Sequence, residues 1–315
     1  MSRMRSTSHM VETMYKYQYS AFGLNIGTEF PLPELPLVET SEHIDVSISL
    51  GQVPHTLADA VSVGTCFQTD GERFLFCMEG VARILGEQGQ HLTVDLEPDT
   101  TWSTLRLFLL GPVAAGLLLQ RGYLPLNGSC ICINGKVVIL TGFRDAGKSS
   151  VAAALSLKGH SVLADDLVVI YSDKKSEYLQ VVPSYPRLKL WPEVLQQLGI
   201  QPDSLPAMRP GSSKRSLMLE RAFVRKPLPV EVAIDIQLGA ASEIEIEPLN
   251  GLQKFRGICA RISNEALYLA INGQQQLLGS CAALAKQINM YRATRPFNGV
   301  SVASFADEIE RIVHG

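Results

Sequence analysis

The sequence lacks the features that mark several classes of protein. Its six cysteines form no Cys-x-x-Cys pair and show no zinc-site spacing, which argues against a redox pair and a structural zinc. The most apolar segment, residues 107–119, is shorter than the ~20 residues needed to span a bilayer and contains Pro112. Residues 1–11 are polar and show no signal peptide. We therefore expect a cytoplasmic protein with reduced thiols and no membrane partner.

An excess of positive charge is also missing. The chain has 28 Lys and Arg against 31 Asp and Glu, a net charge of -3, which argues against a nucleic-acid partner. There is no internal repeat or low-complexity tract. Hydrophobic residues at 46% and charged residues at 19% are ordinary values for a globular protein. A chain of 315 residues can form two domains with a substantial core, and a homo-oligomer remains open.

The pattern around which the chain is organised lies at residues 137–158. A run of β-forming apolar residues precedes Gly-x-x-x-x-Gly-Lys-Ser at 142–149, and a helix-forming segment follows. This order is typical of a loop that binds polyphosphate through backbone N–H groups at a helix N-terminus. Lys148 would reach the outer phosphates, and the Ser149 hydroxyl would bind Mg²⁺. A chance match in an ordinary strand–helix turn is the alternative. The nucleotide-binding candidates are Gly142, Phe143, Arg144, Asp145, Ala146, Gly147, Lys148, Ser149 and Ser150.

Two adjacent aspartates, Asp165 and Asp166, follow the next predicted strand at 161–164. A short crossover places the carboxyl end of this strand beside the phosphate loop, where open α/β sheets bind ligands. Two neighbouring carboxylates repel each other unless a cation or hydrogen-bond donors offset their charge. Mg²⁺ bound with ATP would supply that cation. The alternative is a solvent-facing aspartate that caps a turn, which the nearby phosphate loop disfavours.

Several segments together resemble the HPr kinase/phosphorylase family. The catalytic core of that family is similar, without gaps, to residues 127–166. Its members are P-loop serine kinases related in fold to phosphoenolpyruvate carboxykinase. Residues 19–24, 31–35 and 182–192 are similar to a divergent branch, the HPr-kinase-like proteins found with biosynthetic gene clusters, which include the lasso-peptide precursor kinases.

The resemblance implies an α/β fold, with a P-loop kinase core of the HPr kinase/phosphoenolpyruvate carboxykinase type and a small N-terminal β-rich domain. It also implies ATP and Mg²⁺ as cofactors and direct transfer of the γ-phosphoryl group. Asp166 would take the proton of the acceptor hydroxyl, and Asp165 and Ser149 would hold the metal. Only the alignment decides which aspartate has which role. The catalytic candidates are Asp166, Lys148 and Asp165, and the metal candidates are Ser149 and Asp165.

The sequence departs from the family pattern at two positions. Asp145 stands where these kinases usually have glycine. Aspartate tolerates a left-handed backbone better than most residues. Its charge is unfavourable near phosphate, so we expect the side chain to point away from the nucleotide or toward Arg144. Asn127 replaces the histidine that precedes this strand in the family, and a neutral amide cannot shuttle protons.

We predict three parts of the chain: a disordered tail at 1–14, a β-rich N-terminal domain at 15–102 and the HPr-kinase-like P-loop catalytic domain at 103–315. Alternating apolar residues between Gly and Pro indicate the N-terminal strands. That domain could hold the acceptor or stabilise an oligomer. A helix is predicted at 103–122, kinked or split at Pro112.

The C-terminal half carries further candidates. Amphipathic patterns predict helices at 277–291 and 302–313, and apolar runs predict strands at 230–238 and 244–248. Residues 202–215 are irregular and basic, so they could form a lid over the nucleotide or a solvated linker. Candidates for contact with phosphate or acceptor are Asn127, Arg187, Lys189, Lys214 and Arg215; the basic ones could equally form a solvated edge.

The expectation for function is an ATP- and Mg²⁺-dependent serine kinase that acts on a peptide or protein. By resemblance to the cluster-associated branch, the acceptor would be the C-terminal serine of a lasso-type precursor peptide. A kinase of a small hydroxylated metabolite is one alternative, because the same core can serve free hydroxyl substrates. A non-catalytic ATP-binding regulatory module is another. The presence of Lys148, Ser149, Asp165 and Asp166 together favours catalysis over the bare module.

Overall fold

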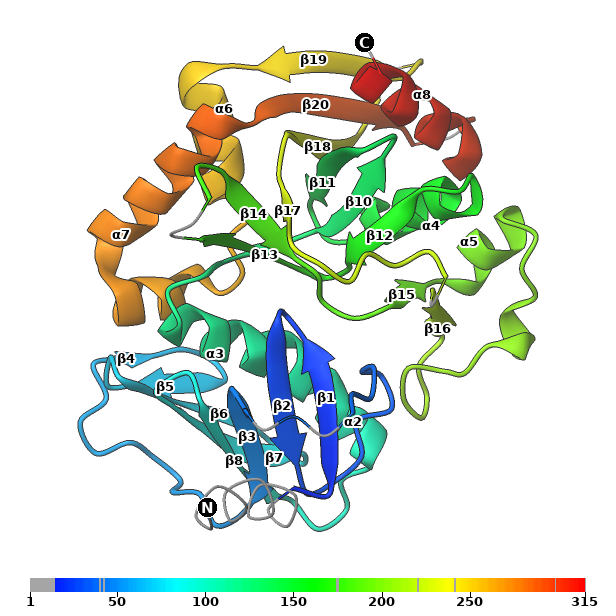
Figure 1. Cartoon of the computed structure of the whole chain (residues 1–315). Coiled ribbons are helices and arrows are strands. Elements are labelled where there is room, and N and C mark those ends of the chain that lie inside the picture. The colour runs from blue at the N-terminus through cyan, green and yellow to red at the C-terminus, as the bar shows by residue number, and fades with distance from the viewer. Residues whose placement is uncertain are drawn as a thin grey trace, which may run out of the picture. The chain divides into compact units, whose positions relative to one another are not determined.

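The computed structural model describes residues 15–314 except 40, 42, 174, 175, 220, 241 and 298, so the predicted tail at 1–14 lies outside the described residues. The protein is a mixed α/β structure whose chain divides into two compact units (Figure 1). Unit 1 contains the described residues up to Gly122 together with Asn264–Gly273. Unit 2 contains Tyr123–Ser263 and the described residues from Gln274 onward. The division thus differs from the predicted boundary at 102/103.

Unit 1 is built on an eight-stranded sheet with strand order β1-β2-β3-β8-β7-β6-β5-β4. Side chains alternate between buried and partly exposed along β7, as expected for a sheet with one covered face. Phe74 on β6 stands opposite Gly86 on β7, and its ring fills the space that a Cβ on Gly86 would need. The strands are β1 (Tyr17–Ala21), β2 (Leu24–Thr28), β3 (Val46–Leu50), β4 (Ser62–Val63), β5 (Phe67–Thr69), β6 (Arg73–Met78), β7 (Ala82–Glu87) and β8 (His91–Leu96).

One helical run, residues 102–120, packs on this sheet. It consists of α2 (Trp102–Phe108), the π-helical turn η1 (Leu109–Val113) and α3 (Ala114–Gln120). The predicted kink is confirmed, because the regular helix gives way to a π-helical turn at Pro112, which has no N–H to donate. By length and composition the run could cross a membrane, contrary to the shorter segment read from the sequence. More than half of this apolar run is buried within the protein, as core helices also are.

Unit 2 contains a six-stranded sheet with strand order β12-β10-β11-β18-β20-β19. Strands β11, β18 and β20 are parallel, so their carboxyl ends meet at one edge. A hairpin joins β10 to β11, and β10 lies between β11 and β12. The carboxyl end of β12 therefore reaches the same edge from one strand further away. The strands are β10 (Ser129–Ile133), β11 (Lys136–Gly142), β12 (Ser161–Ala164), β18 (Val232–Gly239), β19 (Glu245–Leu249) and β20 (Asn289–Pro296).

The helices α4 (Lys148–Leu157) and α8 (Val302–His314) share a buried apolar cluster with this sheet, in which Val151, Ile234 and Phe305 take part. A four-stranded sheet, β17-β14-β13-β9, and a two-stranded antiparallel sheet, β15-β16, complete the strands of unit 2. Their bounds are β9 (Leu124–Asn127), β13 (Leu167–Ser172), β14 (Leu179–Val182), β15 (Arg187–Leu190), β16 (Arg215–Met218) and β17 (Leu228–Pro229). The remaining helices are α5 (Pro192–Gln197), the 3₁₀ turn η2 (Pro202–Ser204), α6 (Gly251–Cys259) and α7 (Glu265–Gln287).

The C-terminal half differs from its prediction in two ways. The helix predicted at 277–291 ends at Gln287, and the strand β20 begins two residues later. This strand was missed because its polar residues, Arg292, Thr294 and Arg295, interrupt the alternation expected of a strand. Helix α7 begins earlier than predicted and contains a non-helical break at Gly273, where the chain passes from unit 1 to unit 2.

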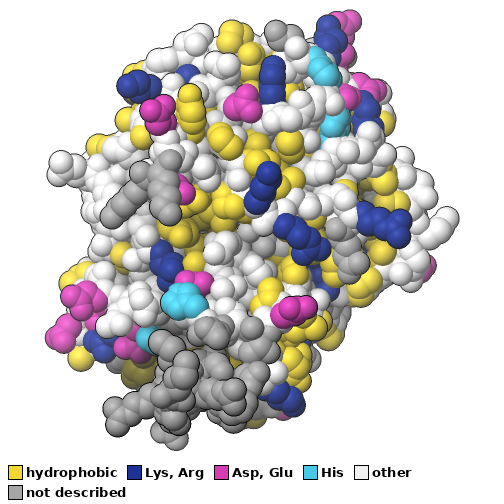
Figure 2. Space-filling model, in the orientation of Figure 1, with side chains coloured by type: hydrophobic (Ala, Val, Ile, Leu, Met, Phe, Trp, Pro, Cys, Tyr) yellow, Lys and Arg dark blue, Asp and Glu magenta, His cyan; other side chains and the backbone are white. Residues whose placement is uncertain are grey.

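The surface shows no segregation of charge on the face drawn in Figure 2, as far as the described residues go. Lys and Arg side chains are interspersed there with Asp and Glu and with hydrophobic groups. This mixture agrees with the nearly balanced composition.

Candidate functional site

The loop predicted to bind phosphate, residues 142–149, connects β11 to α4 through a backbone that only certain residues can adopt. Gly142 has a φ of 145°, and a Cβ there would collide with the carbonyl oxygen of Ile236. Gly147 precedes α4 with a φ of 102°. Asp145 also has a positive φ, 62°, as expected for a residue in a glycine position. The two glycines of the pattern therefore lie where the chain turns, and the loop leads directly into the N-terminus of α4.

The Asp145 side chain points away from the loop interior, as predicted. Its carboxylate lies 3.8 Å from Arg144 Nε and 3.7 Å from Lys214 Nζ. The Trp191 indole donates a 3.4 Å hydrogen bond to the same carboxylate, and Lys214 Nζ lies 4.9 Å from the centre of that ring. These contacts offset the charge that Asp145 would otherwise bring close to a phosphate.

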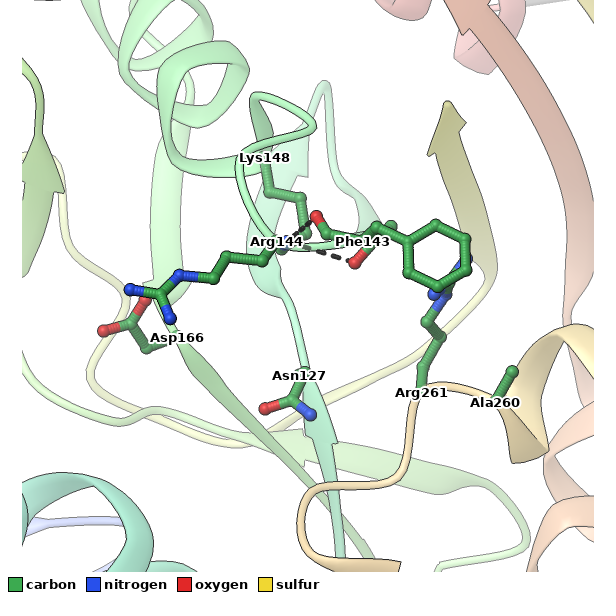
Figure 3. Close-up of a pocket in the computed structure, with 8 residues that line it drawn as sticks. Asn127, Phe143, Arg144, Lys148, Asp166, Ala260 and Arg261 are labelled. Atoms are coloured by element: carbon green, nitrogen blue, oxygen red, sulfur yellow. Dashed lines mark hydrogen bonds between the residues drawn. The ribbon is translucent and has the colours of Figure 1, made fainter. Parts of the chain in front are cut away.

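Lys148 begins α4 and turns back over the loop. Its ammonium donates to the carbonyl oxygens of Gly142, at 3.1 Å, and Phe143, at 2.8 Å (Figure 3). Burial lowers the pKa of Lys148, whereas Asp165 and Asp166 act in the opposite direction. Neutral carbonyls are weaker partners for an ammonium than phosphate oxygens, so a polyphosphate on the loop would be the favoured acceptor.

Asp165 is a buried carboxylate with three donors. Its Oδ1 accepts from the hydroxyls of Ser129, at 2.6 Å, and Ser149, at 2.8 Å. Its Oδ2 accepts from the backbone N–H of Lys189 at 3.2 Å. Burial, together with the neighbouring Asp166, raises the pKa of Asp165 to about 6, although both serine hydroxyls oppose the shift.

The pair of Ser149 and Asp165 fits a magnesium ion shared with a substrate. Both offer oxygen atoms, and Mg²⁺ commonly takes one or two protein ligands and completes its shell with phosphates and water. Residues 15–314, within their described part, contain no group of three or more His, Cys, Asp or Glu placed to hold a metal. The residues thus suit a metal that arrives with a nucleotide better than one enclosed by protein ligands alone.

Asp166 turns the other way from Asp165. It has a φ of 65° and a half-exposed side chain, which forms an ion pair with Lys189. Burial alone would lower the pKa of Lys189. The nearby Tyr185, Asp166 and Asp165 raise it by more, so the pKa lies above its ordinary value. The strand pairing of β9 with β13 places Asn127 beside this aspartate, opposite Leu167. Asp165 therefore binds the Ser149 hydroxyl, whereas Asp166 lines the open cavity.

The loop, Asp166 and Asn127 line a cavity of about 380 Å³ in unit 2 (Figure 3). Arg144 and Lys148 bring positive charge to it. Of the remaining candidates, Ala146 is buried in the core, and Ser150 lies in the first turn of α4. The full lining is Asn127, Gly142, Phe143, Arg144, Lys148, Asp166, Ala260 and Arg261.

The other basic candidates lie outside the cavity wall. Lys189 is paired with Asp166, which lines the cavity, whereas Lys214 is paired with Asp145, which does not. Arg187 donates to the Ser216 hydroxyl at 3.2 Å, and Arg215 lies 3.4 Å from Asp203. Arg187 therefore binds across the β15-β16 strand pair, and Arg215 binds the turn η2.

The sequence analysis missed Ala260 and Arg261, and it missed Asp235, which binds Arg261. Asp235 lies in the apolar strand β18, and a lone acid in such a strand is a signal, because buried charges require partners. Arg261 follows α6, a helix that was not predicted, and no local pattern distinguishes it. Arg295, on the missed strand β20, lies with its Nη1 3.8 Å from the place of a Cβ on Gly147. Burial lowers the pKa of Arg295, and its Nε has no hydrogen-bond partner in the described part of the chain.

Comparison with known proteins finds remote likeness to solved structures only. No family model matches the chain, and no curated protein matches it. Among solved structures, the Hpr(Ser) kinase/phosphatase from Coxiella burnetii is similar at 16% sequence identity. The match covers 60% of this chain and 93% of that one, with a TM-score of 0.33.

Proposed function

We propose that the protein is an ATP- and Mg²⁺-dependent kinase that transfers the γ-phosphoryl group to a serine hydroxyl of a peptide or protein. The observation that carries the proposal is the meeting of a phosphate-loop lysine, a hydroxyl–carboxylate pair and a second carboxylate at one edge of the sheet. Lys148, Ser149, Asp165 and Asp166 form this set. The resemblance of residues 127–166 to HPr kinases supports the same reaction class.

In the proposed mechanism, the loop N–H groups and the N-terminus of α4 bind the polyphosphate. Lys148 leaves the carbonyls of Gly142 and Phe143 for the outer phosphates. A bound magnesium ion would neutralise phosphate charge beside Ser149 and Asp165. Asp166 Oδ1 is available to accept the serine proton, because the ion pair with Lys189 occupies Oδ2. The proton moves late, as the new bond to phosphorus forms, since a serine hydroxyl is a weak acid.

The proposal also concerns the molecule that accepts the phosphoryl group. The resemblance to the cluster-associated branch favours the C-terminal serine of a lasso-type precursor peptide. A metabolite kinase would use the same groups on a free hydroxyl. A regulatory module would need the phosphate loop but not Asp166. An acceptor assay with both precursor peptides and small hydroxyl compounds separates these functions.

Two substitutions test the reaction itself. We expect Lys148→Ala to lower transfer by on the order of 100-fold or more and to weaken ATP binding, because charge stabilisation is lost. Asp166→Asn should lower transfer by about 10²- to 10⁴-fold with nearly unchanged ATP binding, because only the proton acceptor is lost. Phosphate-transfer assays and calorimetry of ATP binding measure the two effects.

Matched controls are Lys158→Ala and Asp307→Asn, which remove an ion-paired lysine and aspartate on α4 and α8, outside the cavity. Both should leave transfer unchanged. Full activity of the Asp166→Asn variant would rule out the proposed base. Unchanged transfer in both site variants would rule out this cavity as the site of the reaction.

A further inference from the structure

Asp235 forms a buried network at the beginning of the phosphate loop. Strand β18 runs parallel to β11, and their register places Asp235 opposite Thr141, the residue before Gly142. The Asp235 side chain is 4% exposed. Its Oδ1 accepts from the Thr141 hydroxyl at 3.2 Å, and its Oδ2 accepts from the Gln237 amide at 3.0 Å. The carboxylate is therefore held by β18 itself and by β11, the strand that leads into the loop.

Arg261 is held by this carboxylate. Its Nε and Nη2 both donate to Asp235 Oδ1, at 2.9 and 2.8 Å, and its side chain is only 7% exposed. The exposed ring of Phe143 covers the guanidinium, with 4.2 Å between the Arg261 Cζ and the ring centre. The third nitrogen, Nη1, forms no hydrogen bond or ion pair with any described residue. Arg261 lines the cavity together with Lys148 and Asp166 (Figure 3).

Stability alone does not account for this arrangement. A buried ion pair costs about as much in desolvation as it returns, and an apolar pair of similar volume is often at least as stable. Arg261 also adds to the effect of burial in lowering the pKa of Lys148, because the two cations lie close together. Two cations around one cavity repel each other unless an anion lies between them. A phosphoryl group is such an anion, and a planar guanidinium with a free N–H edge suits its oxygens.

We propose that Arg261 is a catalytic residue that contacts the phosphoryl group during transfer, opposite Lys148, and that Asp235 is the positioning residue that holds it. This inference rests on the proposed kinase function. In the transfer, the bond from γ-phosphorus to the β–γ bridging oxygen breaks and its electron pair stays on ADP. A new bond forms from the acceptor oxygen to phosphorus, and the acceptor proton goes to Asp166. Arg261 is already fixed before the reaction, so it stabilises the equatorial oxygens without rearrangement.

The test compares Arg261→Ala, Arg261→Lys and Asp235→Asn with the natural protein. We expect Arg261→Ala to lower kcat by on the order of 10³-fold with less than about a tenfold change in the KM for ATP. Arg261→Lys should not restore the rate, because one ammonium cannot hold Asp235 and phosphate together. Asp235→Asn should lower kcat by about tenfold, since a neutral amide orients the guanidinium less well. Added guanidinium ion should restore part of the Arg261→Ala activity, which a structural role would not allow.

A second measurement does not depend on the acceptor. ADP with Mg²⁺ and aluminium fluoride mimics the group in transfer, so Arg261→Ala should weaken binding of this complex much more than binding of ADP alone. The control is Arg106→Lys in unit 1, where Arg106 forms a similarly covered pair with Glu34 at 2.9 Å. That variant should behave as the natural protein in every assay.

The outcomes separate the two proposals. If the natural protein transfers phosphate or binds the fluoride complex, and folded Arg261→Ala matches it within about threefold, the role of Arg261 is wrong and the kinase remains. If folded Arg261→Ala is inactive but guanidinium gives no recovery and the fluoride complex binds normally, Arg261 has only a structural role. If the natural protein shows neither transfer nor fluoride binding, the kinase proposal fails and this inference with it.

Discussion

At the scale of single residues, the candidate site contains side chains whose surroundings shift their pKa values away from the ordinary ones. Asp165 is the clearest case, because burial beside Asp166 raises its pKa from 3.8 to about 6. The buried carboxyl binds a proton more readily than the same group in the unfolded chain. Its contribution to stability is therefore fully present below the unfolded pKa and is lost as the pH rises through the folded one.

This sign gives a prediction for stability against pH. Relative to Asp165→Asn, which does not titrate, the natural protein should lose free energy of unfolding between about pH 4 and pH 7. Urea unfolding of both proteins at a series of pH values measures the difference, from which other titrating groups largely cancel. Magnesium with nucleotide should reduce the loss, because a cation favours the charged carboxylate. A difference that stays constant across this pH range would contradict the assigned pKa shift.

At the scale of elements, the basic stretch before β16 makes direct contact with the phosphate loop. Lys214 reaches Asp145 at 3.7 Å and lies over the ring of Trp191. Part of the stretch is ordered by backbone bonds, including one from Met208 N to the Lys214 carbonyl. A partly exposed ion pair such as this one is weak. The segment could therefore change its position if phosphate binds to the loop, as a lid does.

Limited proteolysis tests the lid. We expect trypsin to cleave after Lys214 or Arg215 in the free protein, and ATP with Mg²⁺ to slow the cleavage, because local opening is reduced. The fluorescence of Trp191 should change with the same nucleotide dependence. Lys214→Gln should weaken that dependence, whereas Lys158→Gln, on the far side of α4, should not. Equal cleavage with and without nucleotide would leave the stretch as a linker.

At the scale of the whole molecule, the chain passes between its two units more than once. Unit 1 ends at Gly122 and takes back Asn264–Gly273 from the C-terminal half. The helical run 102–120, predicted to belong to the catalytic domain, lies instead in unit 1, where Gly116 packs against Phe74 of β6. A boundary placed at 102 therefore separates an apolar helix from the sheet that covers it.

This organisation predicts the behaviour of fragments. A fragment of residues 103–315 should aggregate, because the buried side chains of α2 and α3 would lose their covering sheet and form an exposed apolar patch. Gel filtration and binding of a hydrophobic dye, compared with the full chain, measure this. A monomeric fragment that unfolds as cooperatively as the full chain would show that the unit boundary is wrong.

The sequence by itself determined the strand, loop and helix around residues 142–149, the place of the two aspartates and the strands next to them. These features lie within 137–170, where local spacing decides the structure: glycines permit positive φ, apolar runs form the strands, and a short crossover brings Asp165 to Ser149. The left-handed backbone of Asp145 and the helix break at Pro112 were predictable for the same reason.

Only the tertiary structure decided which distant residues join the loop. Asp235, Arg261 and Arg295 come from three separate segments, and strand order and register bring them together. The same holds for Lys214 and Trp191 at Asp145, and for the return of 264–273 to unit 1. Long-range pairing of strands fixes these positions, and a local sequence pattern does not predict which distant strands pair.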